Sequence, residues 1–145
     1  MALAPGWLIF FPLYFGGLEI RVMCSHCPHY AEPGKSLKCW ANYGSPKLWC
    51  YRPGPMSAAE NILFFAGFAV LFGIPLVFLI LGPAWFLLAL HFVTLAAFRS
   101  TITGFLCSQC MNFACPRNRV SETDRQIFFS RNPAVSQAWG WEKKE

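Results

Sequence analysis

The longest apolar stretch of the chain covers residues 62–98. It contains no Asp, Glu, Lys or Arg, and its markedly polar residues are His91 and Thr94. A bilayer core is about 30 Å thick, so a helix needs about 20 residues to cross it. The stretch is too long for one such helix and fits two short ones, with a turn at Gly82 and Pro83 in its middle. The pattern therefore predicts a transmembrane helical hairpin.

A second apolar segment begins the chain. Residues 2–18 carry no charge, although Pro12, Gly16 and Gly17 weaken a helix there. The segment has neither a basic start nor a small-residue cleavage site, so it does not fit a cleaved signal peptide. We expect residues 1–20 to form a transmembrane helix that enters from outside. A re-entrant or interfacial segment is the alternative.

Two short polar patterns mark the starts of helices. Ser57 and Glu60 have the S-x-x-E spacing of a capping box, which predicts that a membrane helix begins at Ser57. Ser121 and Asp124 have a similar spacing and predict a short helix that ends near Arg131. The segment that precedes Ser57 contains five prolines, so we expect it to be irregular.

Charged residues are scarce and unevenly placed. They make up 13% of the chain, against about 25% in soluble domains, which favours a membrane protein. None of the twelve Lys and Arg residues precedes Arg21 or lies within residues 62–98. A hairpin returns the chain to the side that it left, so all twelve lie on one face, and the positive-inside rule makes that face cytoplasmic. We expect a multi-pass protein of the cytoplasmic membrane with its C-terminus in the cytoplasm. No basic–aromatic motif indicates a nucleic-acid partner.

All seven cysteines lie in the two segments that flank the hairpin, and so on the same predicted face. Cytoplasmic thiols are kept reduced, which favours metal ligands or redox-active groups over structural disulfides. Cys24 and Cys27 form one C-x-x-C pair, and Cys107 and Cys110 form another. Two such pairs complete the tetrahedral shell of four thiolates that suits Zn²⁺ or iron. These four residues are the predicted metal ligands.

Further ligand candidates surround both pairs. Cys39 and Cys115 add thiols, while His26 and His29 interleave with the first pair, where an imidazole could replace a thiolate. The alternative for both histidines is a surface or supporting position. The C-terminal spacing C-x2-C-x4-C-P resembles bacterial iron–sulfur runs, which also end in Cys-Pro but differ in internal spacing. Zn²⁺ and an iron–sulfur cluster both stay open as the cofactor, and Cys50 stays open between a ligand and an inert thiol.

His91 is a separate candidate, because an ionisable group at bilayer depth is costly and is a functional candidate by default. It could hydrogen-bond a quinone, carry a proton or ligate haem. Haem ligation by two histidines would need a partner or a dimer, since the apolar segments hold no second histidine. The alternative is a neutral imidazole bonded to a neighbouring helix carbonyl or to Thr94.

The leading functional hypothesis is a metal-binding membrane protein, with structural zinc or iron–sulfur electron transfer as its two forms. One alternative is a thiol–disulfide redox protein in which one C-x-x-C pair reacts and the other resolves. Another is an accessory subunit of a larger membrane complex. The partners expected are the lipid bilayer and other membrane helices, including further copies of this chain. Whether the protein is an enzyme is left open, since G-x-S-x-G, P-loop and G-x-G-x-x-G motifs are absent.

The predicted fold is an all-α integral membrane protein with a two-helix hairpin, an N-terminal third span and a small irregular cysteine-rich cytoplasmic head. Its segments are an N-terminal transmembrane helix (1–20), a cytoplasmic cysteine-rich segment (21–56), two transmembrane helices (57–82 and 83–106) and a cytoplasmic cysteine-rich C-terminal segment (107–145).

Overall fold

The computed structural model describes residues 3–141, which form helices joined by irregular loops. The outermost residues of the predicted first and last segments, 1–2 and 142–145, lie outside the described residues. No strand occurs within residues 3–141, where an isolated bridge joins Ser36 and Pro46. The helical elements in chain order are α1 (Leu3–Leu13), a π-helical turn (Tyr14–Leu18), α2 (Glu19–Val22), two 3₁₀ turns (Cys24–His26 and Pro28–Tyr30), α3 (Ala58–Leu81), α4 (Trp85–Thr101), a second π-helical turn (Ile102–Leu106), α5 (Glu122–Arg131) and α6 (Pro133–Ala138).

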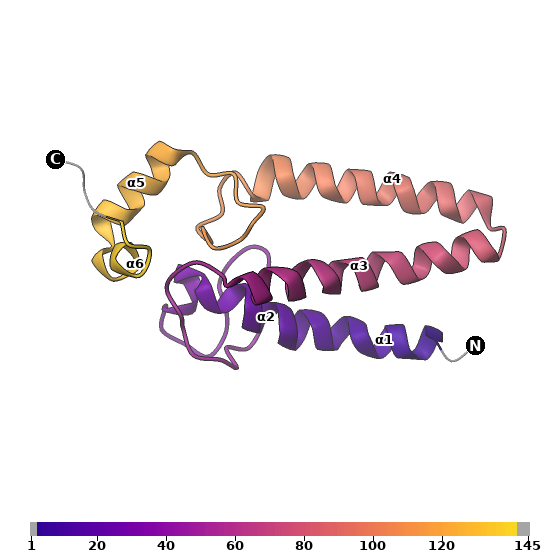
Figure 1. Cartoon of the computed structure of the whole chain (residues 1–145), viewed down its shortest axis with the longest axis horizontal. Helices are drawn as coiled ribbons and strands as arrows, with labels where there is room; N and C mark the ends of the chain where they lie inside the picture. The colour runs from indigo at the N-terminus through magenta and orange to yellow at the C-terminus, as the bar shows by residue number, and fades with distance from the viewer. Residues whose placement is uncertain (1–2, 142–145) are drawn as a thin grey trace.

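Three helical stretches are long and apolar enough to cross a membrane: Pro5–His26, Ala58–Leu81 and Trp85–Leu106. They lie side by side, and the turn between α3 and α4 lies at the same end of the molecule as the start of α1 (Figure 1). The loops, α5 and α6 gather at the opposite end, which we call the loop end (residues 23–57 and 107–141). The prediction of three long apolar helices, two of them in a hairpin, is confirmed.

The ends of the hairpin helices follow from local sequence. The Ser57 hydroxyl accepts a hydrogen bond from the Glu60 backbone N–H at 3.3 Å, and the Glu60 carboxylate accepts one from the Ser57 N–H at 2.9 Å. This capping box begins α3 where the sequence predicts it. The next helix begins at Trp85 rather than at Pro83, because Ala84 has a ψ of 62° and is not helical.

The first helical stretch is fixed to α3 by side chains that reach backbone carbonyls. The Trp7 indole N–H donates to the Leu71 carbonyl at 3.0 Å, and the Tyr14 hydroxyl donates to the Phe64 carbonyl at 2.8 Å. Gly67 allows this close approach, because a Cβ at this position would lie 1.8 Å from the Tyr14 ring. The missing side chain of Gly67 therefore sets how closely α1 and α3 pack.

Helix α4 is covered far less. It packs against α3, and none of its residues is buried. Phe86 is 80% exposed, and Trp85 and Val93 are exposed to a similar degree. An apolar surface of this extent indicates contact with a membrane or with another protein.

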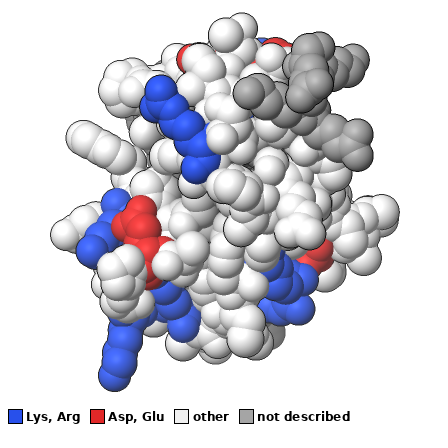
Figure 2. Space-filling model, turned by 90° about the vertical axis from the view of Figure 1, so that its left-hand side faces the viewer, with Lys and Arg blue, Asp and Glu red and all other residues white. Residues whose placement is uncertain are grey.

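Small apolar clusters hold the loop end together. One joins the end of the first helical stretch to the loop that follows. In another, Phe129 of α5 is buried and its ring centroid lies 5.8 Å from that of Trp139. When the loop end faces the viewer, Lys and Arg side chains are spread over it (Figure 2). The apolar cluster at the end of the first helical stretch consists of Ile20, Cys24, Tyr30 and Leu37.

Candidate metal centre at the loop end

Both C-x-x-C pairs stand directly on the ends of long helical stretches. Cys24 begins the 3₁₀ turn that follows α2 and Met23, and Cys107 follows the π-helical turn that extends α4. The hairpin brings these two helix ends to the same end of the molecule (Figure 1). Residues far apart in the sequence thereby become neighbours, as the hairpin prediction requires.

The first pair forms a tight, buried turn. The Cys27 N–H donates to the Cys24 carbonyl at 2.9 Å, and the two residues are 6% and 4% exposed. The side-chain amide of Asn42 donates to the Cys24 sulfur at 3.2 Å. The loop between this turn and α3 therefore folds back over the first thiol.

The second pair lies in a closed loop. The Arg119 N–H donates to the Cys107 carbonyl at 2.9 Å, and the Asn118 amide donates inside the loop to the Cys110 carbonyl at 2.6 Å. Asn112 links this loop to the first, because its side-chain amide donates to the Met23 carbonyl at 3.1 Å. The two cysteine-bearing loops are thus in direct contact.

Thiols from three separate stretches of chain converge on one small cavity of about 210 Å³. Cys24 and Cys27 come from the first turn, Cys39 from the middle of the following loop, and Cys110 from the second loop. Cys107 does not line this cavity. Instead it lines a larger neighbouring cavity together with Cys110 and Cys115.

The pKa values of these cysteines reflect both their burial and the thiols that lie near them. Burial raises the pKa of Cys27 to about 12, and the neighbouring thiols of Cys110 and Cys39 add to the rise. Burial also raises the pKa of Cys110, with smaller contributions from Cys107 and Cys39, and raises that of Cys115 to about 11. Neighbouring thiols contribute to each of these pKa rises, so Cys27, Cys110 and Cys115 each lie near other cysteines.

Backbone donors oppose this rise in the same way at three of the cysteines. The N–H of His29 hydrogen-bonds the Cys27 sulfur, that of Asn112 the Cys110 sulfur, and that of Arg117 the Cys115 sulfur. In each case the donor lies two residues after the cysteine, and the bond lowers the thiol pKa. Hydrogen bonds to the charged form favour that form, so these N–H groups partly offset the effect of burial.

No three His, Cys, Asp or Glu side chains within residues 3–141 lie close enough together to hold a metal ion between them. All seven cysteines are free thiols, and Cys50 is exposed. Cys50 lines neither cavity. The thiols are therefore gathered around a cavity but are not closed into a coordination shell.

The two histidines of the first loop have different surroundings. His29 lines the thiol cavity, and its Nδ1 lies 2.5 Å from the Glu32 carboxylate. In metal sites, the ring nitrogen that does not bind the metal often hydrogen-bonds a carboxylate. His29 therefore stays a ligand candidate. The His26 ring is 8% exposed, does not line the cavity, and its Nδ1 lies 3.0 Å from the Gly54 carbonyl.

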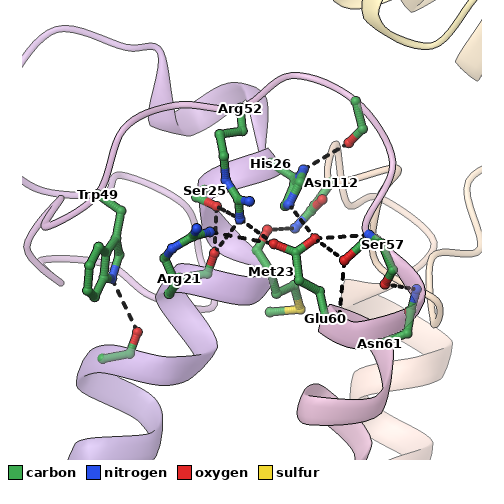
Figure 3. Close-up of polar contacts among 12 residues, drawn as sticks. Arg21, Met23, Ser25, His26, Trp49, Arg52, Ser57, Glu60, Asn61 and Asn112 are labelled. Atoms are coloured by element: carbon green, nitrogen blue, oxygen red, sulfur yellow. Dashed lines mark hydrogen bonds and ion pairs between the residues drawn. The ribbon is translucent and has the colours of Figure 1, made fainter.

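His26 belongs instead to a polar cluster around Glu60, which Figure 3 shows. The Glu60 carboxylate lies 2.6 Å from Arg52, 3.5 Å from Arg21 and 3.5 Å from the His26 Nε2. Arg52 also donates to the Ser25 hydroxyl at 3.0 Å. This cluster fixes the first cysteine turn to the start of α3 and gives His26 a supporting position.

His91 lies outside both cavities. Its Nε2 is buried and has no hydrogen-bond partner among residues 3–141. Thr94, the predicted alternative partner, donates to the Leu90 carbonyl at 2.8 Å instead.

Sequence reasoning missed the asparagines that organise the site. Asn42 contacts the Cys24 sulfur, and Asn112 joins the two loops and is 4% exposed. The position of Asn112, two residues after Cys110, is the local signal that could have identified it, because that N–H is well placed to reach the cysteine sulfur. Asn42 has no such signal, since it reaches Cys24 across the loop.

No protein-family model, curated protein or solved structure matches this chain.

Proposed function

We propose that this chain is an integral membrane protein whose loop end binds a metal ion or cluster through thiolates, and that the metal joins the two cysteine-bearing loops. The proposed ligands are Cys24, Cys27, Cys39 and Cys110. The observation that carries this proposal is the convergence of these four thiols, from three stretches of chain, on one cavity of about 210 Å³.

This ligand set differs in one member from the set that the C-x-x-C spacing predicts. Cys39 takes the place of Cys107, because Cys39 lines the small cavity and Cys107 does not. Cys107 and Cys115 line the larger cavity together with Cys110 and are the next thiols available as ligands. A cluster with more than four ligands would use them.

The groups around the cysteines favour thiolates that bind a metal over thiols that bind none. A metal ion replaces the thiol protons, and the N–H donors two residues after Cys27, Cys110 and Cys115 stabilise the sulfur charge that remains. A cysteine side chain turns about a single bond, so each sulfur can move toward the cavity while its backbone stays in place. Four thiolates suit Zn²⁺, as a structural link between the loops, or an iron–sulfur cluster, as an electron carrier.

A thiol–disulfide role has less support. The thiolate is the reactive form in exchange, and reactive cysteines have lowered pKa values and access to solvent. The pKa of Cys27 and that of Cys110 are raised instead, and Cys27 is buried. An accessory-subunit role is compatible with the metal proposal, because the bare apolar surface of α4 suits a neighbouring membrane helix.

The proposed setting is the cytoplasmic membrane with the loop end in the cytoplasm. Three helices of sufficient length and apolarity support insertion. The twelve basic residues of the chain all lie outside residues 62–98, and Lys and Arg side chains are spread over the face of the loop end that Figure 2 shows. A basic face is retained on the cytoplasmic side.

Anaerobic purification, elemental analysis and a visible spectrum test the metal proposal. Stoichiometric zinc in a colourless protein identifies the structural form, and iron with acid-labile sulfide identifies the electron carrier. Metal-free protein whose cysteines are all alkylated rapidly would refute both forms and favour thiol–disulfide chemistry.

Single cysteine variants then identify the ligands. We expect Cys24→Ser, Cys39→Ser and Cys110→Ser to lose most of the metal to the same extent. Cys50→Ser is the matched control and should keep its metal, because Cys50 is exposed and lines neither cavity. Metal loss in Cys24→Ser without loss in Cys110→Ser would mean that the two loops do not share a site.

A further inference from the structure

A second cavity, of about 870 Å³, lies between α3, α4 and the loop end. Phenylalanines of both helices line it, and two of them, Phe92 and Phe98 on α4, are 54% and 47% exposed. The cavity is therefore open at the side of the molecule, toward the surface that the proposed membrane would cover. The packing of the helices does not use it, and of the proposed metal ligands it is lined only by Cys110.

The polar end of this cavity has buried acceptors that lack a donor. Glu19 and Asn112 both line it and are 6% and 4% exposed. The Oε2 atom of Glu19 and the Oδ1 atom of Asn112 are buried and have no hydrogen-bond partner among the described residues. A buried acceptor without a donor is costly, so such atoms indicate a missing partner group.

Donors also lie at the same cavity. Arg99 and Arg117 line it, and neither forms an ion pair with a carboxylate among residues 3–141. The Arg117 guanidinium donates to the Thr103 hydroxyl at 3.3 Å and has further N–H groups. A ligand head that uses both sets of groups must both donate and accept hydrogen bonds.

We infer that this cavity binds a lipid-soluble hydroquinone. A phenolic hydroxyl donates to an acceptor such as Glu19 or Asn112 and accepts from an arginine, which matches both sets of groups. The flat ring packs on phenylalanine side chains, and an alkyl or isoprenoid tail leaves through the open side between α3 and α4. A phosphatidylcholine fits less well, because its headgroup has no hydrogen-bond donor for the Glu19 and Asn112 acceptors.

The inference goes beyond the metal proposal and does not depend on a bound metal. The cavity nevertheless has Cys107, Cys110 and Cys115 in its wall, so a bound hydroquinone would lie beside the proposed centre. The two proposals are tested separately by measuring ligand binding and metal content in the same samples.

Calorimetric titration of the purified full-length protein with decylhydroquinone, under argon in detergent, tests the inference. We expect saturable binding of decylhydroquinone, and at least tenfold weaker binding of the oxidised decylbenzoquinone, which has no hydroxyl donors. Glu19→Leu should weaken decylhydroquinone binding at least tenfold, because it removes an acceptor while keeping an apolar wall.

Two tryptophan variants of α4 make a matched pair. Ala96 lines the cavity and its neighbour Ala97 does not, although both are exposed. We expect Ala96→Trp to abolish decylhydroquinone binding, Ala97→Trp to bind within twofold of the unsubstituted protein, and both to keep the same metal content.

Three results would overturn the inference. They are an absence of saturable binding, equal affinity for the oxidised and reduced rings, and equal affinity of the Ala96→Trp and Ala97→Trp variants. Displacement of decylhydroquinone by phosphatidylethanolamine at equal concentration would also overturn it and would assign the cavity to a phospholipid.

Discussion

Glu60 joins the start of α3 to two arginines at the border of the loop end. Its carboxylate completes the capping box of α3 and accepts from Arg52 and Arg21, which come from two other stretches of chain. A carboxylate near a helix N-terminus also interacts favourably with the helix dipole. A single side chain therefore stabilises a helix start, an ion-pair network and the turn that carries Cys24.

We predict that Glu60→Ala destabilises the protein by about 1–2 kcal/mol, since it removes a helix cap and leaves two arginines without their carboxylate. Thermal unfolding in detergent measures the change. Glu122→Ala is the control, because Glu122 also begins a helix and pairs with Arg125 but is largely exposed. The control should change stability by less than about 0.5 kcal/mol. Equal losses in the two variants would contradict the central role of Glu60.

At the residue scale, local spacings in the sequence predicted individual turns and caps but not the contacts between distant loops. The cysteine turns were predictable because C-x-x-C is a local spacing, and the Ser57–Glu60 capping box was predictable for the same reason. The position of Cys39 beside Cys27 and Cys110 depends on how a proline-rich loop folds, and no local pattern reports that.

At the scale of elements, the contact between the first helical stretch and α3 depends on the absence of one side chain. We predict that Gly67→Ala weakens this contact by about 1–3 kcal/mol, because the added methyl group overlaps the Tyr14 ring. Gly73→Ala is the matched control in the same helix. Nothing lies within 4 Å of a Cβ at Gly73, so the substitution should be neutral or slightly stabilising.

Unfolding of both variants with increasing SDS mole fraction provides the comparison. We expect Gly67→Ala to unfold at a lower SDS mole fraction than Gly73→Ala. If the two variants unfold alike, the side chain of Tyr14 moves aside easily and Gly67 does not set the helix spacing.

The helices themselves were predicted well because their signals are local. A continuous uncharged run, a glycine–proline turn and serine caps can each be read from neighbouring residues. They located the hairpin and α5. The start of α4 was displaced by two residues, since Pro83 is a good first-turn residue only where the next residue is helical, and Ala84 is not. The closeness of α1 to α3 was not predictable, because it requires Gly67 and Tyr14 to be known as neighbours.

At the scale of the whole molecule, the hairpin places both cysteine loops at one end and the turn between α3 and α4 at the other (Figure 1). We predict that a protease site inserted between Gly82 and Pro83 is cleaved from outside intact cells, while a site fused after Glu145 is cleaved only after the cells are lysed. The positive-inside distribution is the physical reason. Cleavage of the C-terminal site in intact cells would mean that the topology is the opposite one, with the thiols in an oxidising compartment.

The separation of the cysteine loops along the chain also has a consequence for biosynthesis. Cys24, Cys27 and Cys39 leave the ribosome well before Cys110, and the whole hairpin is made between them. In the proposed arrangement, the last ligand reaches the others only after α3 and α4 have entered the bilayer and the chain has returned to its starting side. Metal loading would then be the final step of maturation, and metal content would report how many molecules have completed insertion.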